Sequence, residues 1–221
     1  MKTYIVIPAY NEEKTIGRVI EDLLRESYEH IVVVDDGSSD DTRGIIGRYP
    51  VSLCRHRLNC GQGAALRTGT DFALRQNADI IIHFDADGQH QVKDIRKFVE
   101  KIMQGYDIVI GSRFLGASYK NIPLSKRYLI HKPARLFNRL LTGIKLTDAH
   151  SGFRAVSREA AEKIKITINR MAHNTEIPAE VIRHRLRYAE VPVDVVYHEY
   201  GQNLFDAFEI LADLLKHRIL K

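Results

Sequence analysis

Short β-branched runs alternate with longer amphipathic segments along the first half of this chain, and this alternation restricts the fold more than any other feature. Strands are predicted at Tyr4–Ile7, Ile31–Val34, Val51–Cys54, Ile80–Phe84 and Asp107–Ile110. Helices are predicted between them, at Glu12–Glu26, Gly61–Arg75 and Val92–Met103. Four-residue apolar runs are too short for helices and are typical of strands covered on both faces. This order predicts a doubly wound, mostly parallel α/β sheet.

The second half of the chain has a looser pattern. It predicts a basic helical segment at Leu124–Leu141, a helix at Val156–Ile164, a strand at Ala189–Tyr197 and a helix at Asn203–Leu220. No repeat, low-complexity tract or Pro/Gly-rich linker interrupts the sequence. We therefore expect one domain over residues 1–200 and an amphipathic C-terminal helical extension over residues 201–221. That helix can pack on the domain, on a second copy in a homo-oligomer, or on a membrane surface.

The composition is that of an ordinary folded domain, with 44% hydrophobic and 28% charged residues. No run approaches the roughly 18–20 apolar residues of a membrane-spanning helix. The chain opens on a strand-like run rather than a signal peptide. Its two cysteines, Cys54 and Cys60, cannot form a disulfide framework. We expect a cytoplasmic location, with peripheral contact at the inner face of the membrane as an alternative.

Positive charge is concentrated in one segment. Residues 108–147 contain eight Lys or Arg residues and no Asp or Glu, whereas the whole chain has a net charge of +5. The rest of the chain is therefore net negative. Such a block suits an anionic partner or a solvated face. We expect this partner to be a phosphate group or an acidic membrane surface, and not a nucleic acid.

Polar residues follow four of the predicted strands. They are Pro8–Glu12, Asp35-Asp36, Asp85-Ala86-Asp87 and Ser112-Arg113. In an open α/β sheet, ligands bind at the carboxyl ends of the strands. These side chains are therefore expected to line one crevice.

Asp85-Ala86-Asp87-Gly88-Gln89 is the strongest candidate site in the sequence. It places several oxygen ligands beside one another, as Mg²⁺ or Mn²⁺ prefers, and the carboxylates would repel one another without a cation. The alternative is a loop whose aspartates cap the helix that begins at Val92.

Two other polar segments have both a functional and a structural interpretation. In Asp35–Ser38 a carboxylate can accept hydrogen bonds from a base or ribose, while Ser38–Thr42 is interpreted as a cap and turn. Asn59–Ala65 resembles a dinucleotide-binding glycine fingerprint but follows a weak third strand. We therefore interpret it as a helix start or packing segment.

Six motifs occur in the order found in family 2 glycosyltransferases, and the chain resembles that family over residues 1–196. They are Pro8–Glu12, Asp35–Ser38, Asn59–Ala65, Asp85–His90, Gly111–Phe114 and Ser151–Arg154. Within the family the chain looks like dolichyl-phosphate mannose synthase and related polyprenyl-phosphate glycosyltransferases. The resemblance implies a GT-A fold, inversion at the anomeric carbon, and a metal-bound nucleotide-diphosphate sugar such as GDP-mannose or a UDP-sugar.

The resemblance also assigns donor-side roles residue by residue. Pro8, Tyr10, Glu12 and Asp36 would frame the nucleoside, and Asp85 with Ala86 would contact the donor. Mg²⁺ or Mn²⁺ would be held by Asp85, Asp87 and Gln89.

Arg113 would steady phosphate, and Arg127 and His131 would contact a lipid-phosphate acceptor. Asp148 and Ser151 would shape the acceptor side of the cleft. Together with Asp87 and Arg113, Asp148 completes the expected catalytic set.

The acceptor is where the sequence departs from the family pattern. The loop His198–Asn203, which follows the Glu190–Pro192 strand, is not strongly basic, whereas lipid-phosphate enzymes carry a basic loop there. A lipid phosphate needs no general base. A hydroxyl of a saccharide or another small acceptor, as in cell-surface polysaccharide synthesis, would need one, and Asp148 and Glu176 are the candidates. Glu176 has a surface cap or ion pair as its alternative role.

Two other functional classes fit less well. A sugar nucleotidyltransferase would carry a glycine- and arginine-rich loop where Pro8–Glu12 stands. A nucleotide-sugar sensor without turnover would not need the intact Asp85–Gln89 motif.

Overall fold

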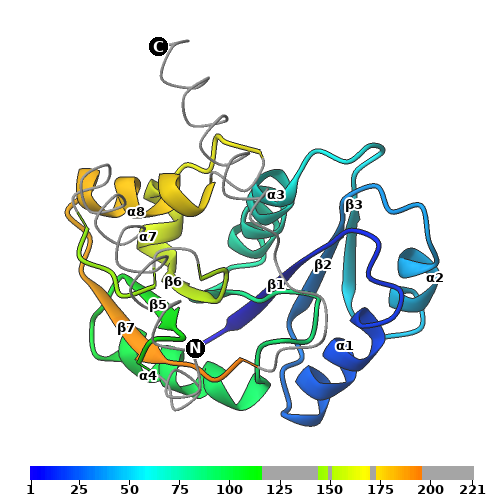
Figure 1. Cartoon of the computed structure of the whole chain (residues 1–221), viewed down its shortest axis with the longest axis horizontal. Coiled ribbons are helices and arrows are strands. Elements are labelled where there is room, and N and C mark those ends of the chain that lie inside the picture. The colour runs from blue at the N-terminus through cyan, green and yellow to red at the C-terminus, as the bar shows by residue number, and fades with distance from the viewer. Residues whose placement is uncertain (116–143, 149–150, 170–172, 196–221) are drawn as a thin grey trace, which may run out of the picture.

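The computed structural model describes residues 1–115, 144–148, 151–169 and 173–195. The strands in this part of the chain are β1 (Thr3–Ala9), β2 (Ile31–Asp35), β3 (Ser52–Arg55), β4 (Ile80–His83), β5 (Ile108–Ser112), β6 (Arg154–Ser157) and β7 (Tyr188–Pro192). They form a sheet in the order β3-β2-β1-β4-β6-β5-β7 (Figure 1). Strand β6 is antiparallel to β4 and β5, and the other pairs are parallel. The predicted mostly parallel α/β fold is confirmed.

The helices cover both faces of this sheet (Figure 1). They are α1 (Ile16–Arg25), α2 (Thr42–Ile46), α3 (Gln62–Arg75), α4 (Ile95–Met103), α7 (Arg158–Lys163) and α8 (His173–Arg183), and a 3₁₀ turn at Val92–Asp94 precedes α4. One core packs α1, α2 and α4 against Ile5 and Ile7 of β1. The other packs α3, α7 and α8 against Tyr4 and Val6 of the same strand. Alternate residues of β1 thus serve opposite cores, as the two-residue period of a strand requires.

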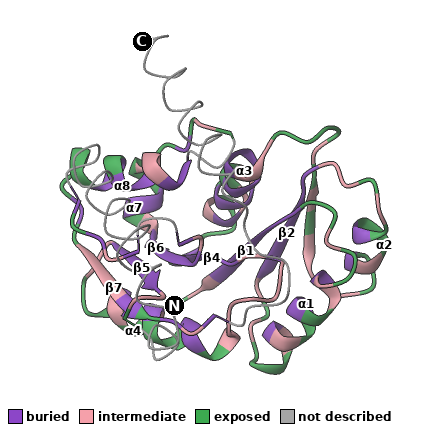
Figure 2. Cartoon of the chain, viewed as in Figure 1, coloured by how far each residue is buried: buried purple, intermediate pink, exposed green. Residues whose placement is uncertain are grey.

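Burial along the strands agrees with a sheet covered on both faces (Figure 2). All five residues of β2 and all five of β5 are buried. By contrast, β3 at the edge alternates between half-buried and exposed positions. The weaker apolar pattern of β3 in the sequence therefore reflects its place at the edge.

Three predicted elements differ from the structure. The helix expected at Glu12–Glu26 begins at Ile16, after turns at its N-terminal end. The helix expected at Val156–Ile164 is instead strand β6 followed by α7, with the hydroxyl of Ser157 accepting a hydrogen bond from Ala160 N. Pairing on both sides, with β4 and β5, overrides the helical pattern there. The strand expected at Ala189–Tyr197 ends at Pro192.

The direction of the strands brings six chain segments to one edge of the sheet. The carboxyl ends of β1, β2, β4, β5 and β7 meet there, because these strands run in the same direction. The amino end of antiparallel β6 lies at the same edge, since Arg154 pairs with His83 on one side and Ile110 on the other. The four predicted strand ends are therefore adjacent, and the Ser151–Arg154 motif joins them.

Candidate active site

The loops after β1 and β2 are tied together by hydrogen bonds. Asn11 N donates to Ser38 Oγ at 3.0 Å, and Ser39 N donates to Asn11 Oδ1 at 2.9 Å. Glu12 N donates to Thr42 Oγ1 at 2.7 Å. The turn role predicted for Ser38–Thr42 is confirmed, and it fixes the segment in which Tyr10 and Glu12 were predicted to frame a nucleoside.

The predicted nucleoside residues differ in exposure. Pro8 is buried inside β1, whereas the side chain of Tyr10 is 45% exposed and available for a flat ligand. Glu12 is half-buried. Burial raises the pKa of Glu12, and the nearby charges of Asp87 and Asp85 add to the effect, although a hydrogen bond from Thr15 opposes it. Negative charge therefore accumulates between the β1 loop and the β4 loop.

Asp36 is buried at the end of β2, and both of its carboxylate oxygens accept hydrogen bonds. Oδ1 lies 2.6 Å from His56 Nδ1 and 3.0 Å from Cys60 N, and Oδ2 accepts from Gly61 N at 2.7 Å. The carboxylate therefore joins β2 to the start of α3. A contact between Asp36 and a nucleoside stays a prediction.

The glycine stretch before α3 has the helix-start and packing roles predicted for it. Gly61 is the N-cap residue with a φ of 94°, in the left-handed region that favours glycine. A Cβ at Gly63 would overlap the backbone oxygen of Ile168. Glycine is needed at Gly63 because α3 lies so close to the backbone of Ile168. This packing explains why the segment resembles a glycine fingerprint.

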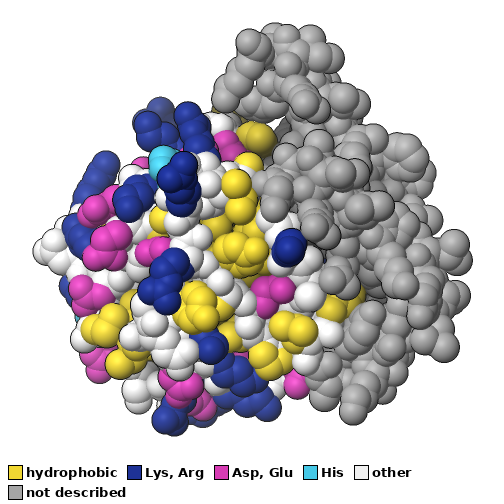
Figure 3. Space-filling view, turned by 90° about the vertical axis from the view of Figure 1, so that its left-hand side faces the viewer, with side chains coloured by type: hydrophobic (Ala, Val, Ile, Leu, Met, Phe, Trp, Pro, Cys, Tyr) yellow, Lys and Arg dark blue, Asp and Glu magenta, His cyan; other side chains and the backbone are white. Residues whose placement is uncertain are grey.

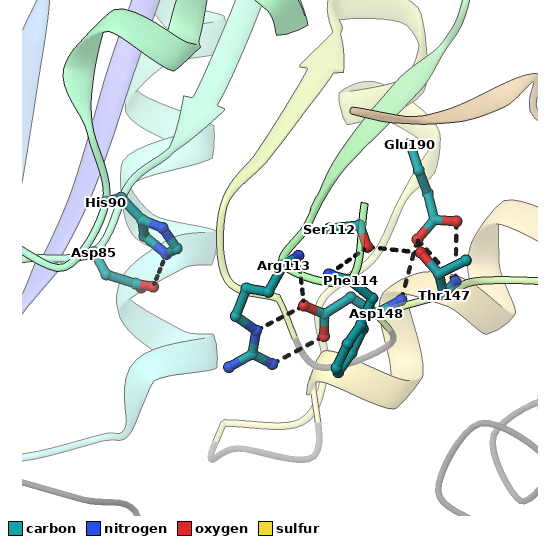
Figure 4. Close-up of polar contacts among 8 residues, drawn as sticks. All are labelled: Asp85, His90, Ser112, Arg113, Phe114, Thr147, Asp148 and Glu190. Atoms are coloured by element: carbon teal, nitrogen blue, oxygen red, sulfur yellow. Dashed lines mark hydrogen bonds and ion pairs between the residues drawn. The ribbon is translucent and has the colours of Figure 1, made fainter. Parts of the chain in front are cut away.

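Asp85 follows β4 and contacts two other segments. Its Oδ1 accepts from Gln62 Nε2 at 3.0 Å, and its Oδ2 lies 3.1 Å from His90 Nε2 (Figure 4). Burial opposes its ionisation, but the hydrogen bond from His90 and the positive charges of His90 and Arg154 lower the pKa of Asp85 overall. Gly152 lies against this carboxylate, and a Cβ there would overlap it. The Ser151–Arg154 motif therefore adjoins the predicted metal site.

Asp87 and Gln89 lie on the same turn as Asp85. Gly88 has a φ of 72°, and Gln89 N donates to Asp87 Oδ1 at 2.9 Å. Two carboxylates and one amide oxygen therefore come from a single five-residue turn. This set of oxygen donors fits Mg²⁺ or Mn²⁺.

Arg113 and Asp148 form a bidentate ion pair beyond β5 (Figure 4). Arg113 Nε lies 2.7 Å from Asp148 Oδ2, and Nη2 lies 2.9 Å from Oδ1. The side chain of Asp148 is only 2% exposed, compared with 26% for Arg113. The structure thus places these two predicted catalytic residues together, with the carboxylate inside and the guanidinium toward solvent.

Glu190 on β7 fixes the backbone that carries Asp148. Its carboxylate accepts from Thr147 N at 2.9 Å, from Thr147 Oγ1 at 2.8 Å and from Asp148 N at 3.1 Å. Thr147 Oγ1 also lies 2.6 Å from Ser112 Oγ (Figure 4). Sequence reasoning missed this role, although a carboxylate near the start of a predicted strand was a signal for it.

Arg154 is a second residue to which the sequence alone assigned no role. Its side chain is 1% exposed, and Nη2 donates to Asn174 Oδ1 on α8. Burial lowers the pKa of Arg154 to about 10, while the charges of Asp85 and Asp148 oppose that shift. Arg154 therefore remains a buried cation at neutral pH. The nearby His83 is neutral, because burial and the charge of Arg154 lower its pKa to about 3.

The other predicted acceptor-side residues have different outcomes. Ser151 is buried, and its Oγ has no hydrogen-bond partner among the described residues. Glu176 accepts hydrogen bonds from Thr167 N and Ile168 N at 2.9–3.0 Å, which confirms the capping interpretation. Arg127 and His131 lie outside the described residues, as does the segment 201–221.

The surface and the helices bear on membrane contact. In the part of the chain that the structure describes, no helix is long and apolar enough to cross a membrane. On the described part of the face in Figure 3, Lys and Arg side chains alternate with acidic and apolar ones. Most of the basic block at 108–147 lies outside the described residues.

Comparison with known proteins adds to this geometry. The family model described as "Glycosyl transferase family 2" matches residues 4–165. UDP-N-acetylglucosamine--dolichyl-phosphate N-acetylglucosaminyltransferase of Methanococcus voltae is 34% identical, over 96% of this chain and 94% of that protein. Polyprenol monophosphomannose synthase of Mycolicibacterium smegmatis is 27% identical, over 97% of this chain and 85% of that protein.

A solved structure shares the fold. It is glucosyl-3-phosphoglycerate synthase from Mycobacterium tuberculosis in complex with Mn²⁺, uridine diphosphate and glucosyl-3-phosphoglycerate. The TM-score is 0.75 at 19% identity, over 97% of this chain and 79% of that one. The GT-A type of α/β fold expected from the sequence is therefore confirmed.

Proposed function

Since this chain belongs to glycosyl transferase family 2, we propose that it is an inverting, metal-dependent enzyme that moves a sugar from a nucleotide-diphosphate donor to a polyprenyl phosphate. The two relatives described above are named for transfer to dolichyl phosphate and for synthesis of a polyprenol phosphomannose. The first name gives a UDP-sugar as the donor of that relative, and the second gives mannose as the sugar in the product of the other. Both relatives are similar to this chain over nearly its whole length.

The observation that carries the choice of acceptor is the state of three carboxylates. Asp148 is paired with Arg113, Glu190 accepts from backbone amides, and Glu176 caps the segment at Thr167. A general base must have an oxygen available to take a proton from the acceptor. A phosphate acceptor is already anionic and needs no such group, so these occupied carboxylates favour a polyprenyl phosphate over a hydroxyl.

On the donor side, Asp85, Asp87 and Gln89 would hold Mg²⁺ or Mn²⁺. Bound there, the cation would neutralise charge that develops on the diphosphate leaving group. Tyr10 would lie against the nucleoside, Ala86 would contact the donor, and the buried Asp36 would keep the start of α3 in place around it.

On the acceptor side, Arg113 would contact phosphate while Asp148 holds its guanidinium in one orientation. Asp148 is thus proposed as a positioning residue rather than a base. Ser151 Oγ, buried and without a partner among the described residues, would donate to the acceptor phosphate. Arg127 and His131 would add contacts from the basic segment. The enzyme would then work at the cytoplasmic face of a membrane, as a peripheral protein.

The test is a transfer assay with radiolabelled nucleotide sugars, each offered to a short-chain polyprenyl phosphate and to the matching unphosphorylated polyprenol. We expect Mn²⁺- or Mg²⁺-dependent labelling of the phosphate alone, with a rate that levels off above the phosphate pKa. Equal labelling of the polyprenol, or a rate that keeps rising as a carboxylate-type base ionises, would contradict the proposal.

A further inference from the structure

A carboxylate, an imidazole and a thiol converge beside the start of α3. They belong to Asp36 after β2, His56 after β3 and Cys60 before α3. One potential ligand atom from each of the three lies within 4.8 Å of the others. Asp36 and His56 are largely buried, with 3% and 16% of their side chains exposed, and Cys60 is exposed.

We propose that Asp36, His56 and Cys60 form a second metal site, selective for Zn²⁺ or a similar borderline-soft cation such as Co²⁺. Thiolate and imidazole ligands favour these ions, whereas an all-oxygen set favours Mg²⁺ and Mn²⁺. The described part of the chain thus has two candidate cation sites with opposite metal preferences. An ion at this one would have three protein ligands and one further position for water.

Hydrogen bonds orient the side chains of His56 and Asp36, while the thiol of Cys60 donates to Leu58 O at 3.3 Å. His56 Nε2 lies 2.9 Å from Thr68 Oγ1, which leaves Nδ1 directed at Asp36. Asp36 is itself held by the amides of Cys60 and Gly61. Hydrogen bonds of this kind fix the ring orientation and tautomer of a metal-binding histidine.

The loop that carries His56 and Cys60 is also fixed in place. Gly37 has a φ of 76°, and a Cβ there would lie 2.7 Å from the backbone of Leu58. His56 N donates to Asp35 O at 2.9 Å. The loop therefore packs directly on the backbone on either side of Asp36. These contacts hold the segments that carry the three ligands against one another.

Metal binding at this site exchanges protons for the cation. In the metal-free protein the 2.6 Å contact between Asp36 Oδ1 and His56 Nδ1 is a hydrogen bond. Zn²⁺–ligand bonds of about 2.0–2.3 Å set the ligand atoms about 3.4–3.8 Å apart. Binding therefore leaves the ring proton of His56 on Nε2, toward Thr68, and releases the thiol proton of Cys60 to solvent. It also moves Asp36 Oδ1 and His56 Nδ1 apart by about 1 Å.

Zn²⁺ at this position would exclude the nucleotide. This competition depends on the proposed function, in which Asp36 lies beside the nucleoside. Metal binding by the three residues does not depend on that function. Zn²⁺ would then inhibit by competing with the donor, and saturating nucleotide would protect the site.

Titration of the metal-free protein with Co²⁺ tests the site directly. We expect a thiolate-to-cobalt charge-transfer band with the d–d intensity of four-coordinate Co²⁺, removed by Zn²⁺ but not by excess Mg²⁺. Cys60→Ser should abolish the band, and the matched variant Cys54→Ser, which alters the other free cysteine, should retain it. Thr68→Val should weaken Co²⁺ binding by about 10–100-fold while leaving the band in place. No band in the wild-type protein, or a band that survives in Cys60→Ser, would overturn the proposal.

Nucleotide binding in the presence of Zn²⁺ separates the two claims. If both hold, Zn²⁺ weakens binding of the preferred nucleoside diphosphate at least about tenfold in the wild-type protein and leaves Cys60→Ser unaffected. A Co²⁺ band without this competition would keep the metal site and would instead place the nucleoside away from Asp36.

Discussion

The proposed donor half of the site, around the β4 turn, and the proposed acceptor half, beyond β5, differ in how their carboxylates are paired. Around the β4 turn, Glu12, Asp85 and Asp87 are three neighbouring carboxyl groups; burial raises the pKa of Glu12, and the charges of Asp87 and Asp85 raise it further. Beyond β5, Asp148 is paired with Arg113 and Glu190 is held by amides and a hydroxyl. The proposed donor half thus has carboxylates that a bound cation would neutralise, whereas in the proposed acceptor half Asp148 is already paired with a guanidinium and Glu190 with neutral donors.

Asp87→Asn should have the largest effect, because it removes a carboxylate from the half that depends on a metal. We expect turnover to fall at least about 100-fold, with the melting temperature nearly unchanged. Asp71→Asn, an exposed position on α3, is the matched control. Full activity of Asp87→Asn in steady-state assays would show that the donor half does not use this metal ligand.

Asp148→Asn tests whether the acceptor half works by orientation or by proton transfer. Losing the bidentate pair should lower kcat about 10–100-fold and reduce the free energy of unfolding by about 1.5–3 kcal/mol. The shape of the pH–rate profile should stay the same, since Asp148 takes no proton in our account. A profile that loses its basic limb would instead identify Asp148 as a base.

Arg127→Ala should weaken use of the acceptor about tenfold while donor binding is kept, because it removes one charge-assisted contact to phosphate. Arg127 lies outside the described residues, so this variant extends the comparison to the basic segment. Arg43→Ala, an exposed position on α2, is the control. Equal loss of donor and acceptor binding in separate titrations would move Arg127 out of the acceptor half.

Glu190→Gln should have the smallest effect. Glutamine keeps one oxygen that can accept hydrogen bonds from Thr147 and Asp148. Its NH₂ group replaces the second oxygen and cannot accept the remaining hydrogen bonds. We expect a cost of about 1 kcal/mol in stability and a rise of about fivefold in the acceptor KM, with kcat little changed. Glu159→Gln on the exposed side of α7 controls for loss of charge. If donor KM rose instead, Glu190 would not act through the Asp148–Arg113 pair.

The two halves also differ in how far the sequence predicted them. The donor half follows from local patterns: each apolar run ends in a polar motif, and parallel strands bring those ends together. Asp85, Asp87 and Gln89 could therefore be grouped from their spacing in the chain alone. Gln62 and His90, which hold Asp85, could not, because their contacts depend on how α3 and the β4 turn pack.

The acceptor half depends on pairing between distant segments. β6 joins β4 and β5 from about 45–75 residues away in the chain, and the sequence pattern at Val156 predicts a helix because these distant partners cannot be recognised from it. The role of Arg154 follows from that insertion, and the role of Glu190 follows from the pairing of β7 with β5. Arg154 belongs to a recognised motif, yet its burial appears only once β6 lies between two strands.

The most direct test of the central claim is whether nucleotide binding requires a metal ion. Thermal unfolding would be followed with UDP, GDP, CDP and ADP, each with and without Mn²⁺ or Mg²⁺, for the wild-type protein and Asp87→Asn. A ligand at a hundredfold excess over its Kd stabilises the native state by about 2.7 kcal/mol. Our account predicts such a shift with UDP or GDP only when metal is present, and its loss in Asp87→Asn. A nucleotide shift of equal size without metal, or no shift with any nucleotide, would contradict it.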